Sequence, residues 1–377
     1  IYRDSVLAGR RVPIREPLLN GQVVGSDSVL NAVYRGKLYW FWGDTSRPSY
    51  PLGNFDVPGA TSAVDLDPEL GVDLTYFLDD KGFAKPTAKM PGKGPTWMTS
   101  LAVLPDAAGR DRLYASFVKV EGTTKIYARG LMLFDDEKQQ FERVAEIDMK
   151  APIFPTGHAF RHRDSDTEYV YFASPYPLTR VRATGDDFLH ADRYEAFTCL
   201  KEGSRLDDPL LDRDDSGKLR YAWKRNTPPV GPMEQSKLVA QKRIKREEGL
   251  LQLRDHDGKP VILHAGSVAW NEYRKRWTMI AVQWGGTSFL GEVWYAEADS
   301  PTGPWTMAVK VATHEKYSFY NPKQHPEFAK AVGRLIFFEG TYAATFSGSP
   351  DPTPRYDYNQ IMYKLDLAGG GLGLSER

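Results

Sequence analysis

The chain has 377 residues, of which 41% are hydrophobic and 26% are charged; this is ordinary globular usage and excludes disorder as the main state. Its 49 basic residues balance 49 acidic ones, so we expect no basic surface of the kind that binds nucleic acid. No apolar run approaches the roughly 20 residues that a membrane-spanning helix needs, and a single cysteine excludes an intrachain disulfide and a cysteine-based zinc cluster.

Short runs rich in aromatic and β-branched residues predict strands along the whole chain. In chain order these runs are 38–42, 113–118, 169–173, 277–282 and 335–338. Each follows a polar turn and an earlier apolar stretch, at 28–33, 99–104, 158–161, 267–270 and 324–328. Repeated antiparallel units of this size are typical of a β-propeller, because circular stacking buries the apolar face of each unit. The sequence therefore predicts an all-β fold, a five-bladed β-propeller.

We expect residues 1–377 to form a single propeller domain. The segment 201–260 departs from the repeating pattern, and it is interpreted as an insertion, a decorated outer edge or a sixth blade. A pair of β-sandwiches is the alternative architecture for the same strands.

Two aspartates flank the first predicted hairpin. Asp27 precedes its first strand, and Asp44 follows its second strand in the sequence Trp42-Gly43-Asp44-Thr45. Because an antiparallel hairpin returns to its starting edge, both carboxyl groups are expected at one rim of the propeller, near its axis. Paired carboxyl groups suit the cleavage of a glycosidic bond, in which one protonates the leaving oxygen and the other activates water or attacks directly. The alternative is that each aspartate only stabilises a turn.

Other residues are candidates for the same rim. Glu339 follows the predicted strand 335–338 and is expected to match Asp44 as a third catalytic carboxyl group, while Glu292 opens a later strand. A sugar-binding site also needs aromatic platforms and hydrogen-bonding side chains. The remaining candidates for substrate binding are Trp97, His158, Gln283, Trp284, His325, Tyr342 and Arg355. For each of these residues, a structural role within a blade is the alternative.

The segments Ser26-Asp27-Ser28 and Trp42-Gly43-Asp44-Thr45, together with 270–277 and 300–305, resemble five-bladed propeller glycosidases. Within that group the chain is most similar to the former domain-of-unknown-function family that contains bacterial endo-D-arabinofuranases. The resemblance implies that a pair of aspartates in the first blade carries catalysis, matching Asp27 and Asp44, and that the substrate is an arabinofuranose-containing polysaccharide. The segments 270–277 and 300–305 indicate turns and strands of the fold rather than a substrate.

No cofactor or metal is expected. Residues 212–217 begin like a calcium-binding loop, but the twelfth position is Trp223 where such a loop has a glutamate. A non-catalytic glycan-binding propeller is the alternative function, because one fold hosts many activities. Since polysaccharides lie outside cells, we expect a secreted or periplasmic protein; the sequence does not indicate an oligomeric state.

Overall fold

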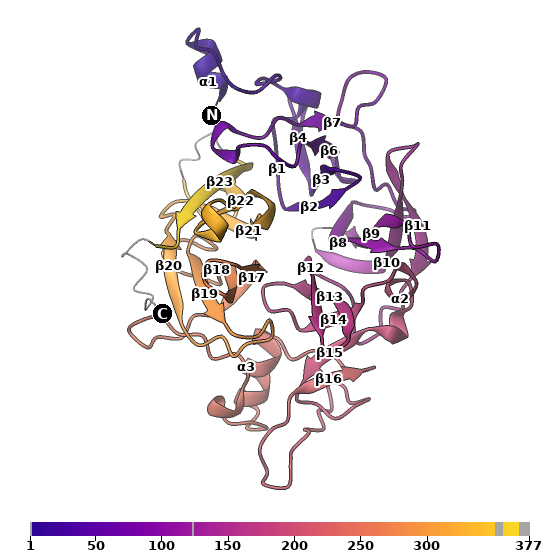
Figure 1. Cartoon of the computed structure of the whole chain (residues 1–377), viewed down its shortest axis with the longest axis vertical. Helices are drawn as coiled ribbons and strands as arrows, with labels where there is room; N and C mark the ends of the chain where they lie inside the picture. Colours follow the sequence, from indigo (N-terminus) through magenta and orange to yellow (C-terminus); the bar gives the residue numbers. More distant parts are fainter. Residues whose placement is uncertain (1, 123, 351–356, 369–377) are drawn as a thin grey trace.

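The computed structural model describes residues 2–122, 124–350 and 357–368. Nearly all of the regular structure is antiparallel sheet, and Figure 1 shows five sheets arranged around one axis. The α-helices of the described residues are short: α1 (Tyr2–Leu7), α2 (Gly185–Phe188) and α3 (Pro232–Ala240). Single 3-10 turns lie at Asn20–Gln22, Pro68–Leu70, Ala191–Arg193, Arg246–Glu248, Pro326–Phe328 and Ala331–Gly333.

Each large sheet is one blade, and its strands pair in sequence order from the axis outwards. The first blade contains β2 (Val29–Tyr34), β3 (Lys37–Trp42), β6 (Gly59–Ser62) and β7 (Thr75–Tyr76). The second contains β8 (Thr96–Pro105), β9 (Asp111–Glu121), β10 (Lys125–Asp135) and β11 (Gln140–Glu146). The third contains β12 (His158–Asp164), β13 (Thr167–Ala173), β14 (Thr179–Arg182), β15 (Glu195–Thr198) and β16 (Ala222–Arg225).

The fourth blade contains β17 (Leu263–Asn271), β18 (Arg276–Gln283), β19 (Val293–Ala298) and β20 (Ala308–Ala312). The fifth contains β21 (Ser318–Gln324), β22 (Leu335–Ala343) and β23 (Asn359–Asp366). The innermost strands contact one another in a closed series, in which β2 meets β8, β8 meets β12, β12 meets β17, β17 meets β21, and β21 meets β2. The predicted five-bladed propeller is thereby confirmed.

The hydrophobic core is divided among the interfaces between neighbouring blades. Between the first and fifth blades, for example, Trp40 and Trp42 pack with Phe328 and Phe337. Between the fourth and fifth, Ile280 and similar side chains of β18 and β19 pack with residues of β21 and β22. Alternate residues of a strand face opposite sides of its sheet, so each blade contributes to two of these cores, one on each side. The ring is therefore held by the packing of every blade on both neighbours.

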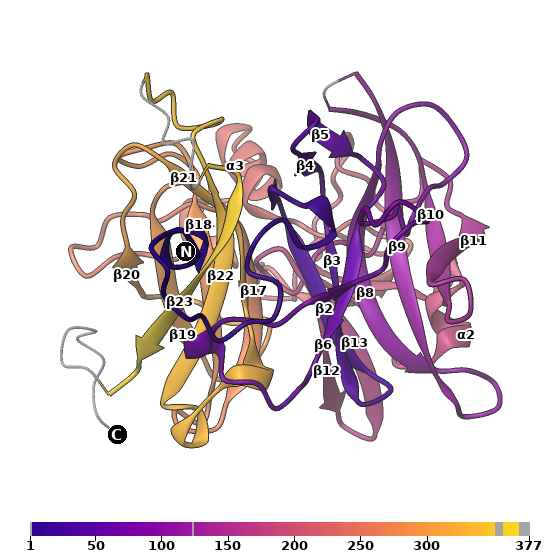
Figure 2. The same cartoon turned by 90° about the horizontal axis from the view of Figure 1, so that it is seen from above.

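A sixth, smaller sheet extends the first blade at one end. It consists of β1 (Gly25–Ser26), β4 (Thr45–Arg47) and β5 (Tyr50–Asn54), in the order β1-β4-β5. Figure 2 shows β4 and β5 at one end of the long strands of the ring. The chain enters β2 and leaves β3 at this end, which is where Asp27 and Asp44 lie.

The predicted strands at 38–42, 113–118, 169–173 and 277–282 are all present, within β3, β9, β13 and β18. The prediction for the inner strand of the fifth unit, 324–328, is wrong. That strand is β21 (Ser318–Gln324), and residues Pro326–Phe328 form a 3-10 turn after it. Pro322 obscured the strand in the sequence, because proline cannot donate to a ladder; here an irregularity between Tyr320 and Lys323 accommodates it.

The segment 201–260 lies at the outer edge of the ring between the third and fourth blades (Figure 1). It contributes β16 as a fifth strand of the third blade and contains α3. A separate small core, which includes Leu200, Leu219, Val230, Leu238 and Ile244, holds it together. No helix among the described residues is long and apolar enough to cross a membrane.

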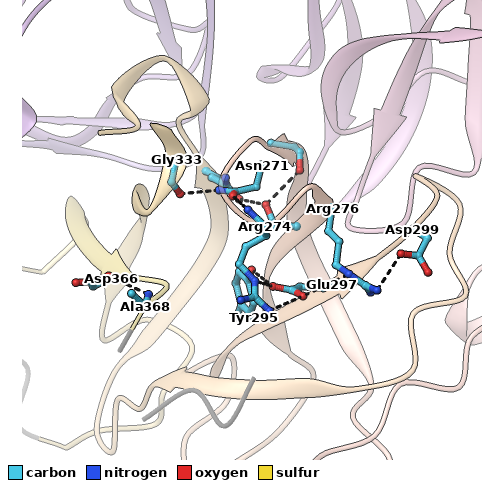
Figure 3. Close-up of polar contacts among 12 residues, drawn as sticks. Asn271, Arg274, Arg276, Tyr295, Glu297, Asp299, Gly333, Asp366 and Ala368 are labelled. Carbon is cyan, nitrogen blue, oxygen red and sulfur yellow. Dashed lines mark hydrogen bonds and ion pairs between the residues drawn. The ribbon is translucent and has the colours of Figure 1, made fainter. Parts of the chain in front are cut away.

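The motif at 270–277 is explained by a polar network in the turn between β17 and β18 (Figure 3). The guanidinium of Arg274 donates to both carboxylate oxygens of Glu297, at 2.7 and 3.3 Å, and the Tyr295 hydroxyl donates to the same carboxylate at 2.7 Å. Asn271 donates from Nδ2 to the carbonyl of Gly333 in the fifth blade, at 2.8 Å. The motif therefore fixes a turn and joins the fourth and fifth blades. It lies at the C-terminal end of β17.

Candidate active site

Asp27 and Asp44 lie side by side where the first hairpin meets the small sheet. The amide of Asp27 donates to the carbonyl of Asp44 at 3.1 Å, and the amide of Gly43 donates to the carbonyl of Asp27 at 2.9 Å. A β-carbon added to Gly43 would lie 2.0 Å from Oδ1 of Asp27, so only glycine leaves room for this carboxyl group. The residues Trp42-Gly43-Asp44 therefore bring the two aspartates together.

The carboxyl group of Asp27 is held by two tyrosines of the fifth blade. The hydroxyl of Tyr320, in β21, and that of Tyr358, just before β23, each donate to Oδ2 of Asp27 at 2.8 Å. Burial raises the pKa of Asp27 above its ordinary value, and the two tyrosine hydroxyls partly oppose that rise. Two donors on one oxygen stabilise the ionised carboxylate.

Asp44 is surrounded differently. Oδ1 of Asp44 accepts a long hydrogen bond of 3.3 Å from Nε1 of Trp97, the second residue of β8 in the next blade. Burial, and then the negative charge of Asp27, raise the pKa of Asp44 to about 7. Asp44 therefore keeps its proton through the mildly acidic range, up to about pH 7.

A set of polar contacts fixes the backbone next to Asp27. Ser28 adopts a left-handed conformation with φ of 41°, which is rare for a residue with a side chain. Its amide donates to Oγ1 of Thr341 at 2.9 Å, and its hydroxyl accepts from Nδ2 of Asn321 at 2.5 Å. Nε2 of Gln360 also donates to Thr341, at 2.9 Å. Strands β21, β22 and β23 of the fifth blade thus hold the loop that carries Asp27.

The contacts of both carboxyl groups are with tyrosine, tryptophan, serine and backbone groups. Within the part of the chain that the structure describes, neither Asp27 nor Asp44 forms an ion pair with arginine or lysine. An ion pair would hold both groups ionised, whereas this environment allows one of them to keep a proton. No cluster of three or more metal-ligating side chains occurs among the described residues.

Glu339 lies elsewhere in its strand than the sequence predicts. It is in the middle of β22, paired in register with Lys323, because β22 continues to Ala343 rather than ending at residue 338. Its Oε1 is 2.8 Å from Nε2 of His325. It also lines a pocket of about 940 Å³ between the first and fifth blades, whose lining includes neither Asp27 nor Asp44. The expected match between Glu339 and Asp44 is therefore wrong.

His325 and His158 were expected at equivalent positions of their blades. Instead, they lie at opposite ends of the inner strands of those blades. His325 follows β21 and is fully buried, with Nδ1 3.2 Å from Oε1 of Glu327. His158 is the first residue of β12, and its Nδ1 is buried without a hydrogen-bond partner among the described residues. Burial, and then the charges of Lys323 and His325, lower the pKa of His158 well below its ordinary value. His158 is thus a neutral group.

The other predicted residues fall into two groups. Trp97 contacts Asp44 directly, and Trp284 is 52% exposed at the end of β18. Gln283 accepts a hydrogen bond from the indole of Trp294 at 2.8 Å, so its amide oxygen is used inside the fourth blade.

Tyr342 stacks on Tyr317 with ring centres 4.3 Å apart, and Glu292 is buried beside Lys310 with Nζ 3.0 Å from its carboxylate. These contacts give both residues structural roles. Arg355 lies outside the described residues.

Sequence reasoning missed Tyr320, Tyr358, Ser28 and Asn321. Tyr358 lies three residues after Arg355, which the sequence suggested for substrate binding, but no pattern indicated the tyrosine itself. Nothing in the sequence connects residue 320 with residue 27, because the contact exists only when the fifth blade closes the ring onto the first.

No protein-family model matches the chain, and no curated protein matches its sequence. Among solved structures, it is similar to an exo-β-1,3-galactanase from Phanerochaete chrysosporium solved with galactose, at 12% identity and a TM-score of 0.47 over 92% of this chain. The matched region spans 62% of that galactanase.

Two further similarities cover most of both chains. A GH43_1 enzyme from Xanthomonas citri complexed with xylose is 14% identical, with a TM-score of 0.42 over 93% of this chain and 90% of the other. An exo-1,5-α-L-arabinanase from a bovine ruminal metagenomic library is 10% identical, with a TM-score of 0.45 over 92% and 94%.

Proposed function

We propose that this protein is a glycoside hydrolase in which Asp44 is the general acid and Asp27 is the ionised partner. One observation carries the proposal: two carboxyl groups lie together at one end of the propeller, and different hydrogen bonds and charges act on each of them. Asp27 accepts two tyrosine hydroxyls, whereas burial and the charge of Asp27 raise the pKa of Asp44 to about 7. Such a pair, one protonated and one ionised, is what glycosidic cleavage requires.

The reaction follows from these states. Asp44 donates its proton to the glycosidic oxygen as the bond to the leaving sugar breaks, so that no alkoxide is released. Asp27 stabilises the positive charge that develops on the sugar ring, and it either activates a water molecule or attacks the anomeric carbon. Tyr320 and Tyr358 hold the Asp27 carboxylate in place, and Trp97 does the same for Asp44.

The substrate class rests on the sequence resemblance. The segments around Asp27 and Asp44 resemble those of bacterial endo-D-arabinofuranases, which supports an arabinofuranose-containing polysaccharide as the substrate. An enzyme that acts on such a polymer works where the polymer is, so we propose that the protein acts outside the cytoplasm, in the periplasm or after secretion.

The proposal is tested by incubating the purified protein with a panel of polysaccharides that contain arabinofuranose, xylose or galactose. The release of new reducing ends is measured, and products are sized by mass spectrometry. Wild-type protein is expected to release oligosaccharides from at least one arabinofuranose-containing polymer. Binding of a polymer in affinity electrophoresis, with no release from any member of the panel, would instead support a glycan-binding propeller.

A further inference from the structure

An exposed aromatic cluster lies at the end of the second strand of the fourth blade. Trp284 directly follows β18 and is 52% exposed; the ring of His264 lies 5.0 Å from it at an angle of 32°. Phe289, 38% exposed, packs edge-on against the indole, with ring centres 5.3 Å apart. We call Trp284, Phe289 and His264 the Trp284 shelf. The two exposed rings pack together on one loop and form an apolar patch, which is the kind of surface on which a ligand stacks.

The Trp284 shelf belongs to the same end of the molecule as the two aspartates. The loop that follows Trp284 reaches the start of β21, where the amide of Phe319 donates to the carbonyl of Leu290 at 2.7 Å. Leu290 packs in one small core with Tyr320, and the hydroxyl of Tyr320 donates to Asp27 at 2.8 Å. A single side chain, Tyr320, therefore separates the shelf loop from the carboxylate of Asp27.

The loop is anchored firmly. The carboxylate of Glu292, which is 1% exposed, binds Lys310 at 3.0 Å and the hydroxyl of Thr313 at 2.9 Å. The hydroxyl of Ser288 donates to the carbonyl of Tyr317 at 2.6 Å. A β-carbon on Gly286, whose φ is 113°, would come within 2.5 Å of the Glu292 side chain. The indole is thus presented on a fixed support, which lowers the entropy lost when a ligand binds.

A sugar ring fits this surface. Each saccharide presents an apolar face of C–H groups, which stacks on an indole, and a rim of hydroxyls. The buried Nδ1 of His264 has no hydrogen-bond partner among the described residues.

The fourth blade is separated from the first by the fifth, because β17 contacts β21 and β21 contacts β2. A ligand that reaches both the shelf and the aspartates therefore has to extend across this end of the ring.

We infer that the Trp284 shelf binds a sugar unit of the substrate chain at a distance from the bond that is cleaved. This inference rests on the proposed glycosidase function and deepens it: the substrate is a saccharide chain of several units, and short glycosides use only part of the site. Glu292 and Gly286 act through the loop, as positioning residues.

The experiment compares Trp284→Ala with Trp270→Ala. Trp270 is the matched control because it is also exposed, at 44%, and belongs to the same blade, but it pairs with Trp277 at the opposite end of β17 and β18. For each protein, kcat/KM is measured on the polysaccharide that the wild type cleaves and on the shortest glycoside that it accepts. Thermal denaturation checks that both variants fold.

Trp284→Ala is expected to lower the ratio of kcat/KM on the polymer to that on the short glycoside by about tenfold or more, as loss of a central aromatic contact does. Trp270→Ala is expected to keep the wild-type ratio, and Trp284→Tyr to restore most of the loss. An unchanged ratio in Trp284→Ala, with an active wild type, overturns this inference alone. A wild-type protein that cleaves no glycan overturns the proposed function and this inference with it.

Discussion

Tyr320 and Asp27 are 293 residues apart in the sequence, yet the tyrosine hydroxyl donates a 2.8 Å hydrogen bond to Oδ2 of Asp27. The contact forms because β21 of the fifth blade packs against β2 of the first and closes the ring. Tyr358, from the segment before the last strand, donates to the same oxygen. Closing the propeller therefore also positions the carboxyl group of Asp27.

Replacing Tyr320 or Tyr358 with phenylalanine is expected to raise the pKa of Asp27 further, because each change removes one donor that stabilises the carboxylate. A hydrogen bond to a charged group contributes roughly 1.5–3 kcal/mol, so the acidic limb of the pH–rate profile should move upwards by about one to two pH units. Tyr127→Phe is the control, since that hydroxyl donates to the carbonyl of Lys93, far from both aspartates. An acidic limb that stays in place in both variants would contradict the role given to the tyrosines.

The pH dependence of the wild type follows from the two carboxyl groups. Asp44 must carry its proton and its pKa is raised to about 7, so kcat/KM should fall as the pH rises above about 7. Asp27 must be ionised, so activity should also fall at acidic pH. A bell-shaped profile measured on a soluble oligosaccharide tests this expectation; a rate that stays constant from pH 7 to pH 9 would count against Asp44 as the acid.

The raised pKa of Asp44 also has a consequence for stability. The folded protein holds this proton up to about pH 7, whereas the unfolded chain releases it near pH 4. The proton on Asp44 therefore contributes fully to the free energy of unfolding below about pH 4. This stabilisation is lost as the pH rises to about 7. The shift corresponds to at most about 4 kcal/mol. Asp44→Asn should accordingly raise the melting temperature at pH 8, and an equal or lower value there would contradict the burial of a charged Asp44.

The fold was largely predictable, because the aromatic and β-branched runs of the second strands are local signals. Trp42-Gly43-Asp44 was informative too, since a hairpin returns to its starting edge and Gly43 leaves space for the Asp27 side chain. The inner strand of the fifth blade was not predictable from the same signals. Pro322 interrupts its pattern, and the expected position of His325 shifted with it, whereas Glu339 was misplaced because β22 continues to Ala343.

The surroundings of the aspartates depend on contacts between blades that are distant in sequence. No spacing rule connects Tyr358 or Asn321 with the first hairpin, and both are positioned by ring closure. Glu292 is a residue that the sequence suggested for the site and that has a structural role instead. Its carboxylate binds Lys310 and Thr313 and so holds the loop of the Trp284 shelf.

The network in Figure 3 gives a prediction about stability alone. Glu297, largely buried, receives two hydrogen bonds from Arg274 and one from Tyr295. Glu297→Ala removes a carboxylate that Arg274 and Tyr295 share, and the loss of hydrogen bonds to a charged group of this kind costs about 1.5–3 kcal/mol. Urea denaturation should show this decrease, whereas Glu272→Ala, at an exposed pair with Lys275, should leave the midpoint unchanged. Equal midpoints for the two variants would show that the Glu297 pair does not stabilise the turn.

The central claim is that Asp44 donates a proton and that Asp27 acts as the carboxylate. The most direct measurement is kcat for Asp44→Asn and Asp27→Asn on the cleaved polysaccharide and on a dinitrophenyl glycoside of the released sugar, whose leaving group needs no proton. Asp44→Asn should lose about 10²–10⁴-fold on the polysaccharide and far less on the dinitrophenyl glycoside. Asp27→Asn should lose activity on both, while Asp257→Asn, an exposed turn residue, should lose none. Wild-type turnover of the polysaccharide by either active-site variant would contradict the account.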